Sequence, residues 1–198
     1  MENIVLASSS TVRQKILTAA GITFELKPAQ IDEHEIKSAL LLEGADPPFV
    51  AEALAEHKSC SVSRRLPERL VVGADQVLEC EKKFYNKPKS LDNAREQLIS
   101  LRGKEHNLTS SVVVSQNGER VWHHNDTALL KMRNFSNRFL DSYISKERDL
   151  LLDSPGCYRV EGLGIQLFSR IEGNFFTILG LPLLPLLDYL RLCGGIAE

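Results

Sequence analysis

The segment Leu70–Lys87 constrains the fold most strongly, because a buried-strand signal and an acidic residue follow each other directly within it. The apolar run Leu70–Val72 is typical of a strand that is covered on both faces, as in α/β proteins. Gly73 and Ala74 then reduce the side-chain bulk, which would let a ligand approach the backbone, and Asp75 follows where we expect the strand to end. Catalytic groups of α/β proteins tend to lie at such carboxyl ends, so Asp75 is the first candidate for a functional residue; the alternative is an acid that caps the strand or turn.

The N-terminal segment has the pattern of an anion-binding turn. A short apolar strand, Ile4–Ala7, runs directly into Ser8-Ser9-Ser10, and a helix is expected from Thr11 to Ala20. The free N–H groups and the dipole of a helix N-terminus favour a phosphate, and the hydroxyl groups of Ser8 and Ser10 add donors. Arg13 lies in the first helical turn and can reach the same point. We therefore predict phosphate binding here, with ordinary N-capping by the serines as the alternative.

The remaining turn and periodicity signals predict alternating strands and helices without an internal repeat or a linker. Thr11 and Gln14 have capping-box spacing, and Asn117-Gly118 is a typical tight hairpin turn. The further elements that we expect are the strand Ile22–Leu26, the helices Phe49–Arg64, Asn93–Arg102 (capped by Asp92), Asn137–Lys146 (capped by Ser136) and Pro182–Leu192, the hairpin strands Leu108–Ser115 and Arg120–Lys131, and short strands punctuated by glycines between Gly156 and Gly173.

Three further charged positions are weaker candidates. The acidic pair Asp32-Glu33 follows the second strand, where a solvated loop is the ordinary explanation. Lys58 is on the helix Phe49–Arg64, and most helical lysines face solvent. The inward face of that helix is expected to hold Val50, Ala53, Leu54 and His57. Lys87 offers a cation on a turn that Pro88 stiffens.

Composition argues against several other classes of protein. A formal net charge of −2 gives no electrostatic case for a nucleic-acid or acidic-membrane partner. The four cysteines lack metal-binding spacing, and His123 and His124, adjacent on a strand, point to opposite faces. Gly162-Leu163-Gly164 lacks the third glycine of a dinucleotide site, which disfavours a Rossmann dehydrogenase. Without a signal peptide or an unbroken apolar span, we expect a cytoplasmic protein with no membrane segment.

Taken together, these motifs resemble the Maf family of nucleoside triphosphate pyrophosphatases over nearly the whole chain. Leu6–Arg13 is similar to the family's LASxSPRR pattern, although Thr11 replaces the proline and Val12 replaces the first arginine. The other similar positions, in chain order, are Glu33, Lys58, Gly73-Ala74-Asp75, Asn86-Lys87-Pro88, Gly156–Gly162, Ile171-Glu172-Gly173 and Gly180-Leu181-Pro182. Asn86 replaces the glycine of the family's GKP motif.

The resemblance implies hydrolysis of a nucleoside triphosphate to the monophosphate and pyrophosphate, with Asp75 as the catalytic base. It implies that Arg13, Lys58 and Lys87 surround the triphosphate, with Ser8 and Ser10 donating hydrogen bonds. Glu33 and Asp75 would hold a divalent metal, most simply Mg²⁺. The implied fold is one Maf-like domain over residues 1–198: a twisted mixed α/β sheet flanked by helices, in two lobes with a central cleft, similar to inosine triphosphatase. The resemblance also implies a possible homodimer.

Two positions bear on the substrate. Gln76 follows the key aspartate, and Glu161 replaces the glutamine of the tail motif; both resemble the family branch associated with 7-methyl-GTP rather than dTTP or UTP. An acceptor-only carboxylate at Glu161 suits the N–H donors of guanine, whereas a glutamine suits thymine or uracil; a contact with a metal or a lysine is the alternative. A competing hypothesis is a non-catalytic nucleotide-binding regulator of septum formation, which the loss of an arginine at Val12 favours.

Overall fold

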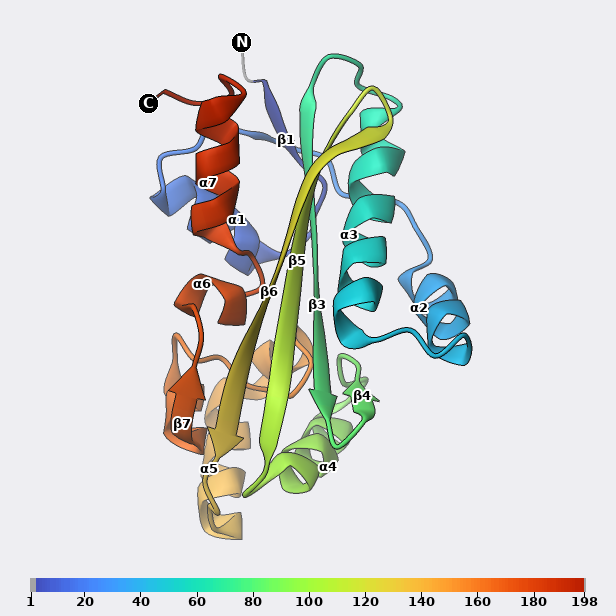
Figure 1. Cartoon of the computed structure of the whole chain (residues 1–198). Coiled ribbons are helices and arrows are strands. Elements are labelled where there is room, and N and C mark those ends of the chain that lie inside the picture. Colours follow the sequence, from blue (N-terminus) through green and yellow to red (C-terminus); the bar gives the residue numbers. More distant parts are fainter. Residues whose placement is uncertain (1–2, 198) are drawn as a thin grey trace. The chain divides into compact units, whose positions relative to one another are not determined.

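The computed structural model describes residues 3–197 and has an α/β architecture (Figure 1). Within these residues one sheet has seven strands in the order β2-β1-β3-β5-β6-β7, with β4 paired to β3. β1 is parallel to β2 and β3, whereas β4 and β7 pair antiparallel with β3 and β6. The predicted mixed sheet with flanking helices is confirmed. The strands are β1 (Ile4–Leu6), β2 (Glu25–Leu26), β3 (Leu70–Cys80), β4 (Lys83–Tyr85), β5 (Glu105–Gln116), β6 (Glu119–Met132) and β7 (Phe168–Glu172).

The chain divides into two compact units, and β3, β5 and β6 contribute residues to both. Unit 1 comprises residues 3–76, 109–126 and 174–197, and unit 2 comprises residues 77–108 and 127–173. The helices of unit 1 are α1 (Thr11–Ala19), α2 (Glu33–Leu42), α3 (Pro47–Ser63), α6 (Phe175–Ile178) and α7 (Leu183–Leu192). Those of unit 2 are α4 (Leu91–Leu101), α5 (Asn137–Glu147) and the 3₁₀ turns η1 (Arg148–Leu152) and η2 (Leu163–Leu167).

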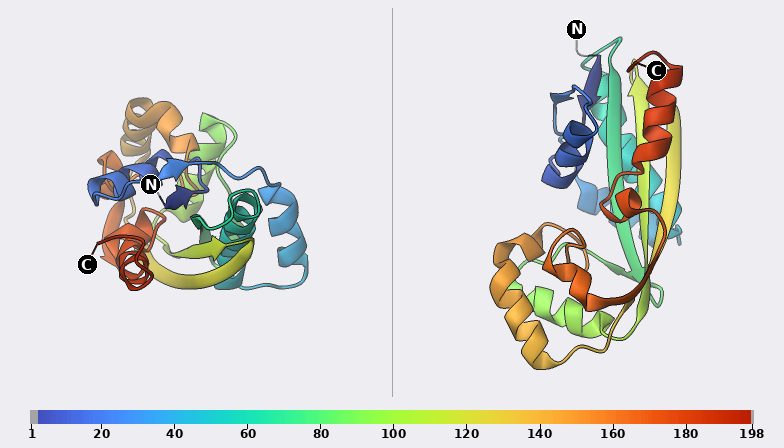
Figure 2. Two further views of the ribbon diagram at one scale, coloured as in Figure 1. Left: turned by 90° about the horizontal axis from the view of Figure 1, so that it is seen from above. Right: turned by 90° about the vertical axis from the view of Figure 1, so that its left-hand side faces the viewer.

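In unit 1 the strands separate two apolar layers. The even-numbered β3 residues Leu70, Val72 and Ala74 pack in the larger cluster with α1 and α7. The odd-numbered Val71 packs in the smaller cluster with Val62 of α3. Figures 1 and 2 show α1 and α7 on one side of these strands and α3 on the other. Because side chains alternate along a strand, the next odd-numbered β3 residues face α3 as well.

Unit 2 has a core of its own. Its fully buried side chains come from α4, α5, η1, the loop before α5 and the segments of β3, β5 and β6 that belong to this unit. They include Leu78, Leu98, Leu101, Leu108, Leu130, Met132, Phe135, Leu140 and Leu151.

Signals that depend only on neighbouring residues are mostly confirmed. Asn117 (φ 55°) and Gly118 (φ 84°) form the β5–β6 turn, and Ser136 accepts the Phe139 N–H at the start of α5. Two predicted caps are wrong by one or two residues. Ser10 rather than Thr11 caps α1, and Ser90 rather than Asp92 caps α4, because each serine oxygen accepts the N–H three residues ahead.

The observed strand boundaries differ more from the predicted ones than the turns and helix caps do. β3 does not end at Asp75 but continues to Cys80 and turns at Glu81 and Lys82, both with positive φ, into β4. The strand expected at Ile22–Leu26 is reduced to β2. The short strands expected between Gly156 and Gly173 are reduced to β7, preceded by η2. Pairing with distant strands, which local sequence does not encode, decides these lengths.

Two helix predictions require correction. The segment after Asp32 is not a loop: Asp32 caps α2 by accepting the Glu35 N–H, and Glu33 is its first residue. On α3, His57 is exposed and Lys58 is buried, the reverse of what we expected, while Ala53 is half-buried. Within the described part of the chain, no helix is both long and apolar enough to cross a membrane.

Candidate active site

The centre of the candidate site is an ion-paired cluster in unit 1. Lys58 Nζ lies 2.7 Å from Asp75 Oδ1 and 2.9 Å from Glu33 Oε1. The Lys58 and Asp75 side chains are 8% and 12% exposed, whereas that of Glu33 is 56% exposed. One buried ammonium group therefore joins two carboxylates, from β3 and from the first turn of α2. The structure brings together three of the residues that the sequence selected separately.

Gly73 explains why Lys58 can reach Asp75. A Cβ atom at Gly73 would lie 2.3 Å from the Ala55 carbonyl oxygen and 2.8 Å from the Ser59 nitrogen, so only glycine lets α3 pack this closely on β3. Gly73 and Asp75 are both odd-numbered β3 residues and share the face toward α3. From the sequence we expected Gly73 to let a ligand approach the backbone. In the structure Gly73 instead lets α3, which carries Lys58, pack against β3.

Arg13 is anchored inside unit 1. Its Nε donates to the Gly180 carbonyl oxygen at 2.7 Å, and its Nη1 donates to the Ala74 carbonyl oxygen at 2.8 Å and to Ser8 Oγ at 3.3 Å. Burial lowers the pKa of the guanidinium below its ordinary value, and the charges of Asp75 and Glu33 act in the opposite direction. Arg13 thus connects α1, the β3 backbone beside Asp75 and the segment before α7.

The turn Ser8-Ser9-Ser10 helps to hold Arg13 in place. Ser8 is buried, and its Oγ accepts from the Ser10 N–H at 3.2 Å as well as from Arg13. Ser10 Oγ accepts from the Arg13 N–H at the start of α1. The N-capping alternative is therefore correct for Ser10, and phosphate binding by this turn remains a prediction.

The sequence reading missed Lys37. This residue is one turn after Glu33 on α2, so both side chains are on the same face of that helix. Burial lowers the pKa of the half-buried Lys37 ammonium, and the charges of Asp75 and Glu33 oppose that shift. The i, i+4 spacing was the available signal, but it carries information only once the segment is known to be helical.

Gln76 points to the opposite face of β3 from Asp75. Its Nε2 donates to the carbonyl oxygens of Thr177 and Ile178, at 3.0 and 2.9 Å, and lies 3.1 Å from Ser110 Oγ. The amide nitrogen is thus engaged with α6 inside unit 1. An effect of Gln76 on substrate choice would act through the position of α6 rather than through this nitrogen.

Lys87 and Glu161 belong to unit 2, and their part in the site remains a prediction. Lys87 is exposed, and Gln97 of α4 donates to the carbonyl oxygen of the preceding Asn86 at 3.0 Å. Glu161 Oε1 lies 3.2 Å from Arg159 Nε, and Arg159 also pairs with Glu147. The Glu161 carboxylate therefore already has a cationic partner.

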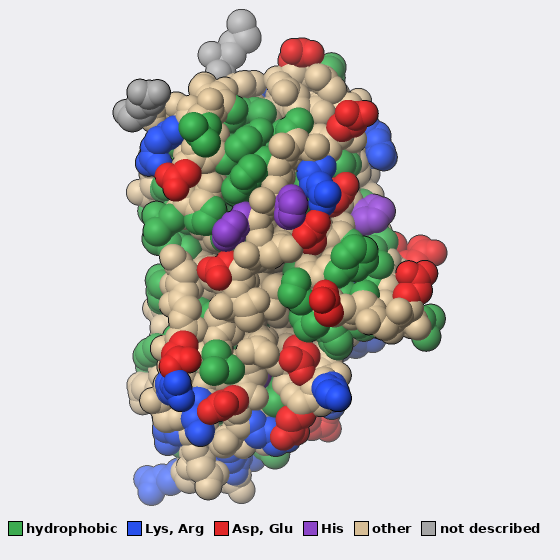
Figure 3. Space-filling model, in the orientation of Figure 1, with side chains coloured by type: hydrophobic (Ala, Val, Ile, Leu, Met, Phe, Trp, Pro, Cys, Tyr) green, Lys and Arg blue, Asp and Glu red, His purple; other side chains and the backbone are tan. Residues whose placement is uncertain are grey.

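The carboxylates of the site suit a hard divalent cation. Asp75 and Glu33 converge on the Lys58 ammonium, which marks a place where positive charge is stabilised from two sides. Mg²⁺ is commonly held by one or two carboxylates, with phosphate oxygens and water as its other ligands. Among the described residues no group of three His, Cys, Asp or Glu could enclose a metal. Histidine side chains reach the surface on the face shown in Figure 3, whereas His106 is buried.

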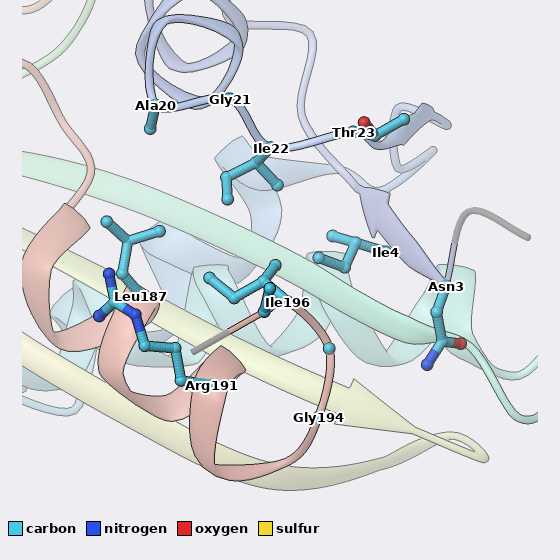
Figure 4. Close-up of a pocket in the computed structure, with 12 residues that line it drawn as sticks. Asn3, Ile4, Ala20, Gly21, Ile22, Thr23, Leu187, Arg191, Gly194 and Ile196 are labelled. Atoms are coloured by element: carbon cyan, nitrogen blue, oxygen red, sulfur yellow. The ribbon is translucent and has the colours of Figure 1, made fainter.

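A separate hollow in unit 1 contains none of the candidate residues. It has a volume of about 530 Å³ and is lined by Asn3 and Ile4, the segment 20–23 that follows α1, the α7 residues Leu187 and Arg191, and the segment 194–197 that follows α7 (Figure 4). Arg191, the one charged residue among the described residues that line it, is paired with Asp188 at 3.0 Å. The hollow lacks the convergent polar groups of a binding site.

A mixed α/β fold with an aspartate–lysine–glutamate ion-pair cluster beside an anchored arginine offers the charges that proteins use to bind phosphorylated ligands. The chain belongs to the Maf family: the family model described as Maf-like protein matches residues 3–193.

Similar proteins match over almost their whole length. A nucleoside triphosphate pyrophosphatase of Paramagnetospirillum magneticum is 50% identical over 94% of this chain and 96% of its own. A 7-methyl-GTP pyrophosphatase of Rhizobium meliloti is 45% identical over 98% of this chain and 97% of its own. Another protein of that name, from Brucella abortus, is 44% identical over 95% of this chain and 94% of its own. Some relatives are thus named nucleoside triphosphate pyrophosphatase in general, and others are named for 7-methyl-GTP.

Proposed function

We propose that this member of the Maf family hydrolyses 7-methyl-GTP, with Mg²⁺, to the monophosphate and pyrophosphate. The chain is a nucleoside triphosphate pyrophosphatase, a hydrolase, as its near-full-length relatives are named. The observation that carries the proposal is the buried Asp75, ion-paired with Lys58 at 2.7 Å, in the same cluster as Glu33.

The chemistry asks mainly for positioning and charge neutralisation. Water attacks the α-phosphorus, and the bond to the bridging oxygen breaks, so that pyrophosphate leaves. Asp75 orients this water and accepts its proton. Lys58 holds the Asp75 carboxylate in place and, with Arg13, provides positive charge for the phosphates. A divalent metal held by Glu33 and Asp75 would neutralise negative charge on the phosphate oxygens.

The choice of 7-methyl-GTP rests on two supports. Relatives of 44–45% identity carry that name, and Glu161 offers a carboxylate that can accept only. Methylation at N7 places positive charge on the purine, and a carboxylate favours such a base over neutral thymine or uracil. Because Arg159 already pairs with Glu161, the base would have to share or displace this partner.

Pyrophosphate release by the purified protein with Mg²⁺ tests the proposal. The nucleotides compared are 7-methyl-GTP, dTTP and the four common ribonucleoside triphosphates, UTP among them. The highest kcat/KM is expected for 7-methyl-GTP, and Glu161→Gln is expected to reduce this preference. A preference for dTTP or UTP would contradict the assigned substrate and leave the hydrolase in place. Nucleotide binding without release from any substrate would instead favour the regulator of septum formation.

A further inference from the structure

β5 carries three fully buried serines in unit 1, and one of them differs from the others. Ser110 Oγ donates to the Thr177 carbonyl oxygen at 2.8 Å, and Ser115 Oγ lies 2.7 Å from Ser59 Oγ. Ser111 Oγ has no hydrogen-bond partner among the described residues. A buried hydroxyl group without a partner costs about 1–3 kcal/mol. Such an atom calls for an explanation in terms of a ligand or of function.

The strand register places Ser111 on the same face of the sheet as Asp75. Glu68 N donates to Asn117 Oδ1, and Gln76 Nε2 donates to Ser110 Oγ, so β5 runs antiparallel to β3. Gln76 and Ser110 meet on one face. Their neighbours Asp75 and Ser111 therefore share the other face, across the two strands.

Contacts with α3 independently place Asp75 and Ser111 on the same face of the sheet. Asp75 bonds Lys58 of α3, and Ser115, which alternation puts on the same face as Ser111, bonds Ser59 of α3. The unpaired hydroxyl and the ion-paired carboxylate thus both lie in the layer between the sheet and α3. The ion pair with Lys58 uses Asp75 Oδ1, so Oδ2 is the oxygen that can serve as a base.

We propose that Ser111 is a catalytic residue that holds the attacking water together with Asp75, an assignment that rests on the proposed hydrolase function. The Ser111 hydroxyl donates to one lone pair of the water, and one water proton points to Asp75 Oδ2. The second lone pair forms the new bond to the α-phosphorus as the bond to the bridging oxygen breaks. Pyrophosphate takes the electron pair of that bond, and Asp75 takes the proton. A donor fixed in a buried site needs no reorganisation during the reaction.

Ser111→Ala tests the assignment. We expect kcat to fall roughly 10- to 100-fold while KM for the Mg²⁺–nucleotide complex stays within about twofold, because the lost bond is to water rather than to substrate. The melting temperature should stay the same or rise, since an unpaired buried hydroxyl is removed. Ser115→Ala is the matched control: it removes a buried, bonded hydroxyl from the same strand and face, and should lower the melting temperature with kcat unchanged.

The other outcomes separate the explanations. An unchanged kcat for Ser111→Ala would overturn the assignment. A lowered melting temperature together with kinetics like those of Ser115→Ala would also overturn it, since Ser111 would then be structural. Absence of pyrophosphate release from the unmodified protein would overturn the proposed function, and the catalytic assignment with it.

Discussion

At the scale of single residues, burial rather than identity distinguishes the functional lysine. Lys58 is 6% exposed and ion-paired, whereas His57, its neighbour on α3, is exposed. A buried lysine needs a partner, because an unpaired charge in the interior is strongly unfavourable. Asp75 and Glu33 supply two partners, so the ammonium group keeps one carboxylate within reach if the other is neutralised.

Asp75→Asn removes the base while leaving the Lys58–Glu33 pair. We expect kcat to fall by a factor on the order of 1,000 and nucleotide affinity to change little, because phosphate contacts through Arg13 and Lys58 persist. Single-turnover pyrophosphate release and nucleotide-binding titration would measure the two effects. Asp188→Asn, at an exposed ion pair, is the control; full activity of Asp75→Asn would remove the base assignment.

His106 makes the stability of unit 2 depend on pH. Burial lowers its pKa to about 4; its Nε2 bonds Tyr158 at 2.8 Å, and its Nδ1 has no partner among the described residues. An unfolded histidine titrates near 6.5, so between pH 6.5 and 4 the unfolded chain binds more protons. Stability from the neutral His106 is therefore complete above pH 6.5 and decreases as pH falls to 4, by about 3 kcal/mol in total.

Denaturant unfolding at several pH values measures this loss. His106→Gln keeps a hydrogen-bonding partner for Tyr158 and should lose less stability than the unmodified protein over the same pH range. Equal pH dependence in His106→Gln and the unmodified protein would show that His106 is not the group responsible.

At the scale of elements, the close packing of α3 on β3 determines the geometry of the site. The contact depends on Gly73, whose missing side chain leaves room for the α3 backbone at Ala55 and Ser59. α2 contributes Glu33 from its first turn, although none of its residues is fully buried. The site is therefore formed by one tightly packed helix and one helix with few buried contacts.

Gly73→Ala should push α3 away from β3. The obstructing atom is a backbone oxygen that cannot move alone, so we expect a loss of about 1–3 kcal/mol or more in stability. kcat should also fall, because the Lys58–Asp75 distance changes. Gly162→Ala, whose Cβ would meet atoms no closer than 3.7 Å, is the control for stability. A Gly73→Ala protein with unchanged melting temperature would contradict this account of the packing.

At the scale of the whole molecule, the two units carry different parts of the family pattern. Arg13, Lys58 and Asp75 belong to unit 1, while Lys87 and Glu161 belong to unit 2. β3, β5 and β6 run through both units, so each unit depends on strands that the other shares. Functional tests of unit 2 residues are thus tests of whether both units take part in catalysis.

Lys87→Ala is the direct test of unit 2. Lys87 is exposed, so its loss should leave the melting temperature unchanged. If it binds the triphosphate, KM should rise about 5- to 10-fold, equivalent to a contact of roughly 1 kcal/mol. Lys89→Ala, at an exposed lysine two residues later, is the matched control. Equal KM values for both variants would remove Lys87 from the binding site.

Features that depend on adjacent residues could be predicted from the amino-acid sequence. Asn117-Gly118 forms its hairpin turn because both residues adopt positive φ, and Ser136 caps α5 through a hydrogen bond only three residues away. The ordered motifs from Leu6–Arg13 to Gly180-Leu181-Pro182 also identified the family, since residue types in order need no coordinates.

Features that depend on contacts between distant segments could not be predicted and are known from the folded chain. Asp75 is inside a strand rather than at its end because β3 extends through pairing with β4 and β5. α2 has no fully buried residue, so its sequence lacks a strong helical periodicity of apolar residues and the helix was not predicted. Lys37 was missed for this reason. Lys58 and Ser111 are buried because α3 packs on one face of the sheet, and the local sequence cannot encode which face a distant helix covers.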